Sequence, residues 1–171
     1  AYLAENPPID LANVVAGFNF DRVLPTGKTK DMAVIGYGAS ELEDYLEEEL
    51  EKQGRYINPD PNPEKGYFYR SDHISFAKKG VPVLYSDDGF DLEIGGIEKG
   101  FNEIYDYTNN RYHGVDDEYD ASWNLEGFEQ TINTLFNISF ELSNSNDWPN
   151  WYEGNEFRSL RDAQLLTKKT P

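Results

Sequence analysis

Two histidines stand beside carboxylates in this 171-residue sequence, and histidine occurs nowhere else in it. One of them, His113, is followed by the acidic residues Asp116, Asp117, Glu118 and Asp120. A neutral imidazole is a common zinc ligand, particularly when a carboxylate holds its second ring nitrogen. His113 is therefore a candidate metal ligand, and the alternative is an ordinary loop histidine in an acidic turn.

Asp21 is the second candidate ligand. It follows the apolar segment 14–20, which we predict to be a buried strand. In open α/β sheets, ligands gather just beyond the ends of the strands, so a carboxylate at this position is suited to bind a metal. The alternative is an aspartate that only caps a turn.

Other kinds of site are excluded or disfavoured by the residue types. The chain has no cysteine, so it has no disulfide, no thiolate zinc site and no cysteine nucleophile. Ser71, Asp72 and His73 are adjacent, but a catalytic triad is assembled from separated segments. We predict instead that Ser71 caps a short helix. The acidic run after His113 does not fit a calcium-binding EF-hand loop, because Ala121 stands where the turn glycine belongs.

Charge limits the possible partners. The sequence has 15 Lys and Arg against 32 Asp and Glu, which gives a formal net charge of -17. Such an acidic surface repels nucleic acids and anionic lipid headgroups, and it attracts cations, including substrates with a free amine. No apolar run is long enough to cross a bilayer. We therefore expect no nucleic-acid partner and no membrane span.

The elements that must position these residues alternate between short strands and amphipathic helices. Leu42, Leu46 and Leu50 recur at four-residue spacing, as on one face of a helix. The segment 86–114 is rich in Gly, Asp, Asn and Tyr, and is predicted to be a long irregular loop. The predicted strands are 14–20, 32–37 and 81–85, the predicted helices are 40–53, 72–79, 124–143 and 156–168, and a proline-rich loop is predicted at 58–66. This order favours an α/β layered fold in a single domain.

Three blocks of the sequence resemble metallopeptidase family 28, which includes bacterial di-zinc aminopeptidases. The first block is 69–85, which begins Tyr-Arg-Ser-Asp-His-Ile-Ser-Phe. The second is 112–123, and the third is 146–158. The segment 17–21 also stands where the family has a strand that ends in a metal-binding Asp. The resemblance keeps the family's order over nearly the whole chain.

The resemblance implies a three-layer αβα fold, in which helices flank a mixed central sheet. It also implies two Zn2+ ions that share a bridging carboxylate and a bridging water, held by five protein ligands beside a glutamate general base. Two metals can activate such a water together. By position, Asp21 corresponds to the ligand that completes one zinc, and His113 corresponds to the ligand that completes the other.

Part of the family's metal centre has no counterpart in this sequence. In the family, a first His, the bridging Asp, a Glu ligand and the Glu base all precede the strand that carries Asp21. Two ligands, one for each metal, do not hold a di-zinc centre. We therefore expect residues 1–171 to be the C-terminal part of a peptidase catalytic domain whose N-terminal part is missing. Such a fragment would be inactive alone and need not bind zinc.

The resemblance implies roles for seven further residues. Tyr69, or its neighbour Tyr67, corresponds to a tyrosine that stabilises the substrate oxyanion, and the alternative is a packing aromatic. Asp117 corresponds to an acid that braces the loop of the ligand histidine without binding the metal. The segment 87–111 would form part of the rim of the substrate pocket. Its aromatic residues Phe90, Phe101, Tyr105 and Tyr107 would shape a preference for apolar N-terminal residues, unless they only pack their own loop.

The expected activity is that of a zinc-dependent aminopeptidase acting on peptides with a free N-terminus. One alternative is a glutaminyl-cyclase-like enzyme, which shares the fold but uses a single zinc. Another is a non-catalytic acidic binding module, which the acidity, the aromatic content and the missing ligands favour. Relatives of this family are often exported, so we expect a periplasmic or secreted protein.

Overall fold

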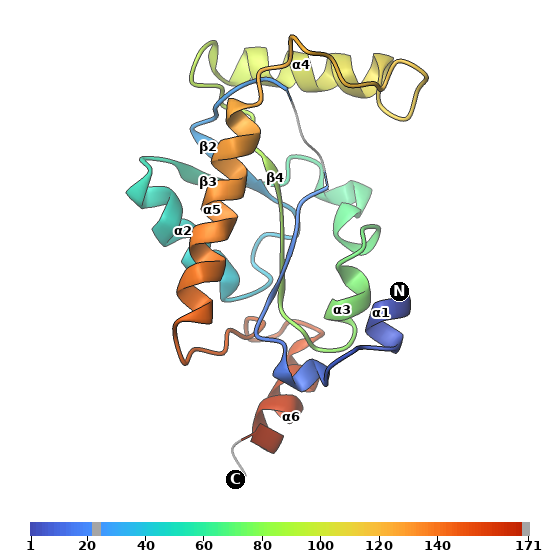
Figure 1. Cartoon of the computed structure of the whole chain (residues 1–171), viewed down its shortest axis with the longest axis vertical. Helices are drawn as coiled ribbons and strands as arrows, with labels where there is room; N and C mark the ends of the chain where they lie inside the picture. Colours follow the sequence, from blue (N-terminus) through green and yellow to red (C-terminus); the bar gives the residue numbers. More distant parts are fainter. Residues whose placement is uncertain (22–24, 169–171) are drawn as a thin grey trace.

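A mixed four-stranded sheet lies at the centre of the computed structural model, which describes residues 1–21 and 25–168 (Figure 1). The strands are β1 (Gly17–Asn19), β2 (Asp31–Val34), β3 (Tyr56–Pro59) and β4 (Val83–Asp88). The α-helices are α1 (Tyr2–Glu5), α2 (Leu42–Lys52), α3 (Ile74–Ala77), α4 (Gly96–Asn110), α5 (Glu126–Ser143) and α6 (Arg158–Lys168). Short 3-10 helices lie at Leu11–Asn13, Pro63–Lys65 and Tyr67–Tyr69. Within the described ranges, no helix combines the length and the apolar character needed to span a membrane.

The strand order in the sheet is β1-β4-β2-β3. Strand β4 pairs in parallel with β1 and antiparallel with β2, while β2 pairs in parallel with β3. The predicted α/β fold with a mixed sheet is therefore confirmed, and the three predicted strands overlap β1, β2 and β4. The prediction of a loop from residue 58 is partly wrong, because β3 continues to Pro59. Strand β3 lies at an edge of the sheet, where a proline is tolerated.

Helices α2 and α5 pack together over one face of the sheet. The predicted stripe Leu42, Leu46 and Leu50 is fully buried there, which confirms the amphipathic helix. The other members of this hydrophobic cluster come from the strands and from α5, namely Met32, Val34, Leu84, Leu135, Ile138 and Leu142. Burial of these apolar side chains is the main favourable contribution to the packing of this layer.

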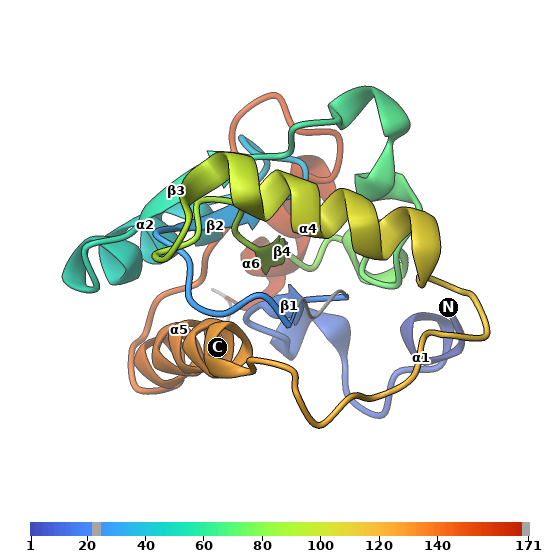
Figure 2. The ribbon, with the colours of Figure 1, turned by 90° about the horizontal axis from the view of Figure 1, so that it is seen from above.

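Helix α4 covers part of the opposite face, so the sheet lies between two helical layers (Figure 2). Successive strand residues point to opposite faces, and Ala33 of β2 points away from α2 and α5. It packs with Phe90 and Ile104 in a second cluster. The expected arrangement of helices on both sides of a mixed sheet is thus present in this chain.

The prediction that 86–114 forms an irregular loop is wrong. Strand β4 continues to Asp88, and α4 occupies fifteen residues of this segment. A Cβ on Gly100 would lie 2.0 Å from the carbonyl oxygen of Phe90. The glycine therefore lets α4 approach the end of β4 closely, which a glycine-rich composition alone does not indicate.

The buried carboxylate of Asp31 fixes the chain between β4 and α4. It accepts hydrogen bonds from the backbone N–H groups of Phe90 and Asp91, at 3.0 and 2.8 Å, and from Asn58 Nδ2 at 2.8 Å. Arg55 donates to the carbonyl oxygen of Asp31 at 2.8 Å. Because a buried carboxylate is stable only when it is hydrogen-bonded, these contacts join β2, β3 and the start of the α4 segment into one unit.

Candidate functional site

Asp21 lies just beyond β1, and its carboxylate is hydrogen-bonded to a distant part of the chain. Ser71 Oγ donates to Asp21 Oδ2 at 3.0 Å, and Asn19 Nδ2 donates to Ser71 Oγ at 3.1 Å. The hydroxyl therefore connects the end of β1 with a residue 50 positions later. The prediction that Ser71 caps a helix is wrong, because α3 begins at Ile74 and has no side-chain cap.

His73 is buried close to this hydrogen-bonded chain. His73 is 3% exposed. The centroid of its ring lies 4.7 Å from that of Phe68 and 4.9 Å from that of Tyr85, so the imidazole packs against both rings. Among the described residues, neither ring nitrogen has a hydrogen-bond partner. Burial lowers the pKa of His73 to about 4, against the opposing effect of the Asp21 and Asp72 charges. The imidazole is therefore neutral at physiological pH and packs as an aromatic ring.

His113 follows α4 in a turn with an unusual backbone. It is the only non-glycine residue with a positive φ in the part of the chain that the structure describes, at 58°. The left-handed conformation costs such a residue about 1 kcal/mol and persists only where surrounding contacts hold it. The exposed imidazole stacks on the ring of Tyr112, with a centroid distance of 3.9 Å and an interplanar angle of 21°. The turn and the stacked ring together set the direction of the imidazole.

Asp117 bridges this turn and helix α4. One carboxylate oxygen accepts a hydrogen bond from the N–H of His113 at 3.3 Å, and the other accepts one from Tyr107 Oη at 2.8 Å. Burial, followed by the hydrogen bond to Asp117, raises the pKa of Tyr107 to about 12. Tyr107 therefore stays protonated and donates to Asp117 at physiological pH.

Arg111 holds the far side of the same loop. Its Nε donates to the carbonyl oxygen of Asp116, and its Nη2 donates to that of Glu118, each at 3.0 Å. The guanidinium also lies over the Trp123 ring, 5.5 Å from the centroid. These contacts tie the end of α4 to the loop that precedes α5. Arg111 was not predicted as a site residue, and Tyr107 was expected only on the rim of the substrate pocket, because the segment that carries them was not predicted to be a helix.

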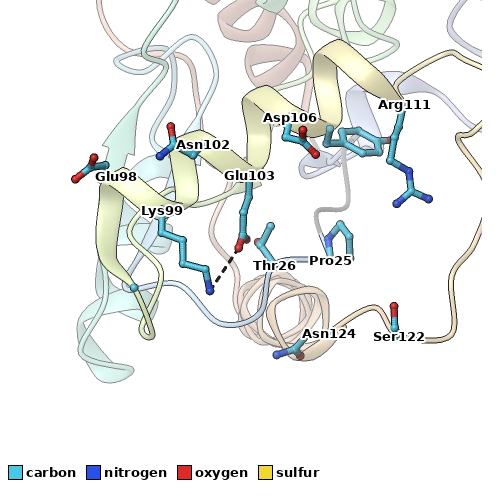
Figure 3. Close-up of a pocket in the computed structure, with 12 residues that line it drawn as sticks. Pro25, Thr26, Glu98, Lys99, Asn102, Glu103, Asp106, Arg111, Ser122 and Asn124 are labelled. Carbon is cyan, nitrogen blue, oxygen red and sulfur yellow. Dashed lines mark ion pairs between the residues drawn. The ribbon is translucent and has the colours of Figure 1, made fainter.

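A cavity of about 780 Å³ lies between α4, the turn at 25–26 and the loop before α5 (Figure 3). Its wall on α4 carries both signs of charge, and Lys99 is paired with Glu103 at 3.4 Å. Asp21 and His113 do not line this cavity, although Thr26 and Arg111 from the neighbouring segments do. Residues that lie close to both candidate ligands in the sequence therefore line the cavity, but neither candidate ligand does.

Peptidase family M28 matches residues 1–138. The chain belongs to this family. No curated protein and no solved structure gives a significant match. Membership of family M28 identifies the chain as a metallopeptidase sequence and peptides as the substrate class, and the M28 family is generally zinc-dependent. The resemblance noted in the sequence is therefore confirmed, although its 146–158 block lies outside the matched residues.

The M28 match includes the hydrogen-bonded pair Asp21 and Ser71, and also the turn that carries His113. Asp117 lies in the matched segment as well and contacts the His113 backbone. Sequence reasoning missed the contact of Ser71 with Asp21, although Ser71 belongs to the Ser-Asp-His string on which the resemblance rested. The signal was present in that string, but only the folded chain shows which carboxylate the hydroxyl reaches.

Tyr69 of this M28 chain is 58% exposed and donates from its hydroxyl to Glu156 Oε1 at 2.9 Å. This hydrogen bond is the main reason that the pKa of Tyr69 is raised. The neighbouring Tyr67 is 39% exposed, and Lys65 lies over its ring. In this structure the Tyr69 hydroxyl is thus directed at a carboxylate, and its role toward a substrate oxyanion stays a prediction.

Phe90 is buried in the fold, and Phe101 is half-buried beside it. Phe90 is 4% exposed and stacks on Phe101, with a centroid distance of 4.9 Å and an interplanar angle of 15°. Both belong to the cluster that packs α4 on the sheet. The contacts of Phe90 and Phe101 in this structure are those of aromatic residues that pack the fold, which was the alternative to the predicted place in the substrate pocket.

A zinc centre needs more donors than this M28 chain brings together. Counting only residues that the structure describes, no three His, Asp or Glu side chains are placed to hold one metal ion. Asp21 lies beyond β1 and His113 lies after α4, and no hydrogen bond or ion pair within the same ranges joins them. A carboxylate and an imidazole are suitable zinc donors, but zinc sites use three or four protein ligands. These residues alone therefore do not form a zinc centre.

Proposed function

We propose that this chain is part of a zinc-dependent aminopeptidase, which removes N-terminal residues from peptides with a free N-terminus. The observation that supports the proposal most strongly is that hydrogen bonds from other parts of the chain hold both candidate metal donors in place. Ser71 holds the Asp21 carboxylate, and Asp117 holds the turn of His113. Both donors also lie within the residues that family M28 matches.

The substrate class follows from charge. The formal net charge of -17 attracts cations and repels polyanions, and a peptide with a free N-terminus carries an ammonium group at physiological pH. An enzyme that acts at the N-terminus benefits from such a field, because it raises the local concentration of the end that reacts.

We further propose that Asp21 and His113 each complete the coordination of one zinc ion, and that the other ligands and the glutamate base come from residues outside these 171. Two surfaces support this proposal. Strand β1 is an edge strand with half-buried residues. Helix α5 carries Ile132, Phe136 and Phe140, which are 40%, 61% and 61% exposed. Apolar surface of this kind commonly marks a contact with another part of a protein.

The experiment that tests the proposal compares Asp21→Ala and His113→Ala with the wild-type full-length protein. The measurements are zinc content and the rate of aminoacyl-nitroanilide hydrolysis. Each variant is expected to bind less zinc and to lose activity by at least about 100-fold, because even residues that only orient a zinc ligand are worth 10- to 100-fold. Glu47→Ala, on the exposed side of α2, is the matched control and should retain both properties.

Other outcomes of the same experiment favour the alternative functions. One zinc ion per full-length chain, together with cyclisation of N-terminal glutamine, would indicate a glutaminyl-cyclase-like enzyme. Absence of both zinc binding and turnover in the wild-type protein would indicate a non-catalytic acidic module. Wild-type zinc content and activity in both variants would refute the roles of Asp21 and His113.

A further inference from the structure

The last turn of α4 makes a set of contacts that converge on His113. We propose that Tyr107 is a positioning residue, which holds the His113 turn through the carboxylate of Asp117. This inference rests on the proposed function, since it assigns Tyr107 a role toward a residue that we propose as a zinc ligand. It gives Tyr107 a role other than the place on the pocket rim that the sequence suggested, and family membership does not assign that role.

Tyr107 acts on the turn through its backbone as well as its side chain. Its carbonyl oxygen accepts hydrogen bonds from the N–H groups of Arg111 and Tyr112, at 2.9 and 3.0 Å. Its hydroxyl donates to Asp117 Oδ1 at 2.8 Å. One residue of α4 is therefore bonded to the chain on both sides of His113.

Asp117 transmits this contact to His113. Its second oxygen accepts the N–H of His113 at 3.3 Å, the residue whose φ is 58°. A backbone conformation that is unfavourable for a side-chain-bearing residue must be held by its surroundings. The carboxylate of Asp117 is exposed to solvent. If the Tyr107 hydroxyl were removed, water would compete for the Asp117 oxygen that the hydroxyl now contacts.

Ring contacts extend from Tyr107 to the imidazole. The Tyr107 and Tyr112 rings lie 6.0 Å apart at 53°, and Tyr112 stacks on His113. Tyr107 is half-buried against the α4 cluster, whereas Tyr112 and His113 are exposed. In this row of three rings, the half-buried Tyr107 ring is therefore at one end and the exposed imidazole of His113 is at the other.

The test uses Tyr107→Phe in the full-length protein, because this change removes the hydroxyl and keeps the ring. Tyr105→Phe is the matched control, since Tyr105 is on the same helix and is 55% exposed. In Tyr107→Phe, the backbone amide of His113 should exchange its hydrogen about three- to tenfold faster, the range for one lost hydrogen bond. Tyr105→Phe should leave this rate unchanged. An unchanged rate in Tyr107→Phe would overturn the proposal.

Asp117→Asn and the double variant show whether Tyr107 acts through Asp117. If it does, the double variant should exchange no faster than Asp117→Asn alone, because the two changes interrupt one connection. Additive effects would overturn the proposed route. A purely structural role would lower the global unfolding midpoint, whereas a positioning role weakens zinc binding about three- to tenfold at an unchanged midpoint.

Zinc binding by His113→Ala separates the proposed role of Tyr107 from the proposed role of His113. If His113→Ala binds zinc normally, then the proposed zinc ligand is wrong, whatever the exchange rates are. If His113→Ala loses zinc while Tyr107→Phe exchanges and binds as the wild type does, then the ligand is right and Tyr107 does not position it.

Discussion

Single hydrogen bonds decide how the two candidate donors are presented. Ser71 has one hydroxyl proton, and because Asn19 donates to Ser71 Oγ, that proton is given to Asp21. The carboxylate is thereby fixed by one of its oxygens at the end of β1. At the second candidate donor, Asp117 accepts hydrogen bonds from both the His113 N–H and the Tyr107 hydroxyl. Ser71 thus positions Asp21, and Asp117 positions His113; Asp21 and His113 are the residues that we propose to bind metal.

Replacing Ser71 with Ala tests the first of these contacts. The variant should bind zinc about 10- to 100-fold more weakly in the full-length protein, which is the usual effect of losing a hydrogen bond that orients a metal-binding side chain. Competition with a chelator measures the dissociation constant. Ser75→Ala, on α3, is the control and should bind zinc as the wild type does. Equal zinc affinity in both variants would contradict the role of Ser71.

The buried imidazole of His73 predicts a loss of stability in acid. Its pKa is about 4 in the fold and 6.5 without the fold, so between these values the unfolded chain binds more protons. The contribution of neutral His73 to the free energy of unfolding is therefore fully present above about pH 6.5, and it falls as the pH is lowered toward 4. The decrease should reach about 2–3 kcal/mol at pH 4.5. Urea unfolding at several pH values measures it.

The control for this prediction is His73→Phe, which keeps an aromatic ring between Phe68 and Tyr85 but does not titrate. Other groups titrate equally in both proteins, so the difference between the two unfolding free energies isolates the effect of His73. Parallel pH curves for the two proteins would show that His73 is not buried in its neutral form.

Among the elements, α4 is the helix on which the His113 turn depends. It carries Tyr107 and Arg111 in its last turn and just beyond it, and it packs on the end of β4 through Gly100. A helix placed by such a close approach is sensitive to a single added carbon. The position of the His113 turn is thus linked to the packing of residues about one helix length away.

Gly100→Ala should destabilise the protein although alanine is normally the better helix former. The added Cβ would lie 2.0 Å from the Phe90 carbonyl oxygen, so the helix must move away from β4. We expect a cost of about 1–3 kcal/mol in the free energy of unfolding, the usual effect of overpacking. Asn102→Ala, at an exposed position of α4, should stay within about 0.5 kcal/mol. A neutral or stabilising Gly100→Ala would contradict this packing.

At the scale of the whole molecule, the two helical layers are unequal in what they bury. Helix α5 faces the core with Thr131, Leu135 and Ile138, and it leaves Phe136 and Phe140 exposed on its other side, with their rings 6.1 Å apart. Large apolar side chains at four-residue spacing on an exposed face form a surface suited to a further layer of protein. We propose that the rest of the catalytic domain supplies that layer.

The double variant Phe136→Ser, Phe140→Ser tests this proposal in the full-length protein. If the two rings are buried there, the free energy of unfolding should fall by at least about 3 kcal/mol, since truncating one buried Phe typically costs that much. Asn133→Ser, at an exposed position of the same helix, is the control. A change of less than about 0.5 kcal/mol in the double variant would mean that the strip faces solvent in the complete protein.

Patterns along the sequence were enough to predict strands β1, β2 and β4, helix α2, the α/β fold class and the family. The leucine spacing in α2 is periodic, and the apolar runs of β1 and β4 are continuous over a few residues, so composition and spacing are enough to predict these elements. The Ser-Asp-His block and the acidic run after His113 indicated the family that the match to residues 1–138 then established. Periodicity failed for α4, because Gly100 looks like a helix breaker until its packing partner is known.

Which distant side chains contact one another is evident only in the folded chain. The contact of Ser71 with Asp21 spans 50 residues, and it exists because the segment that carries Ser71 folds back beside the end of β1. The positive φ of His113 and its hydrogen bond to Asp117 likewise depend on where α4 ends. Spacing along a chain reports a local repeat, whereas a contact between distant segments depends on strand order and packing, which the spacing does not encode.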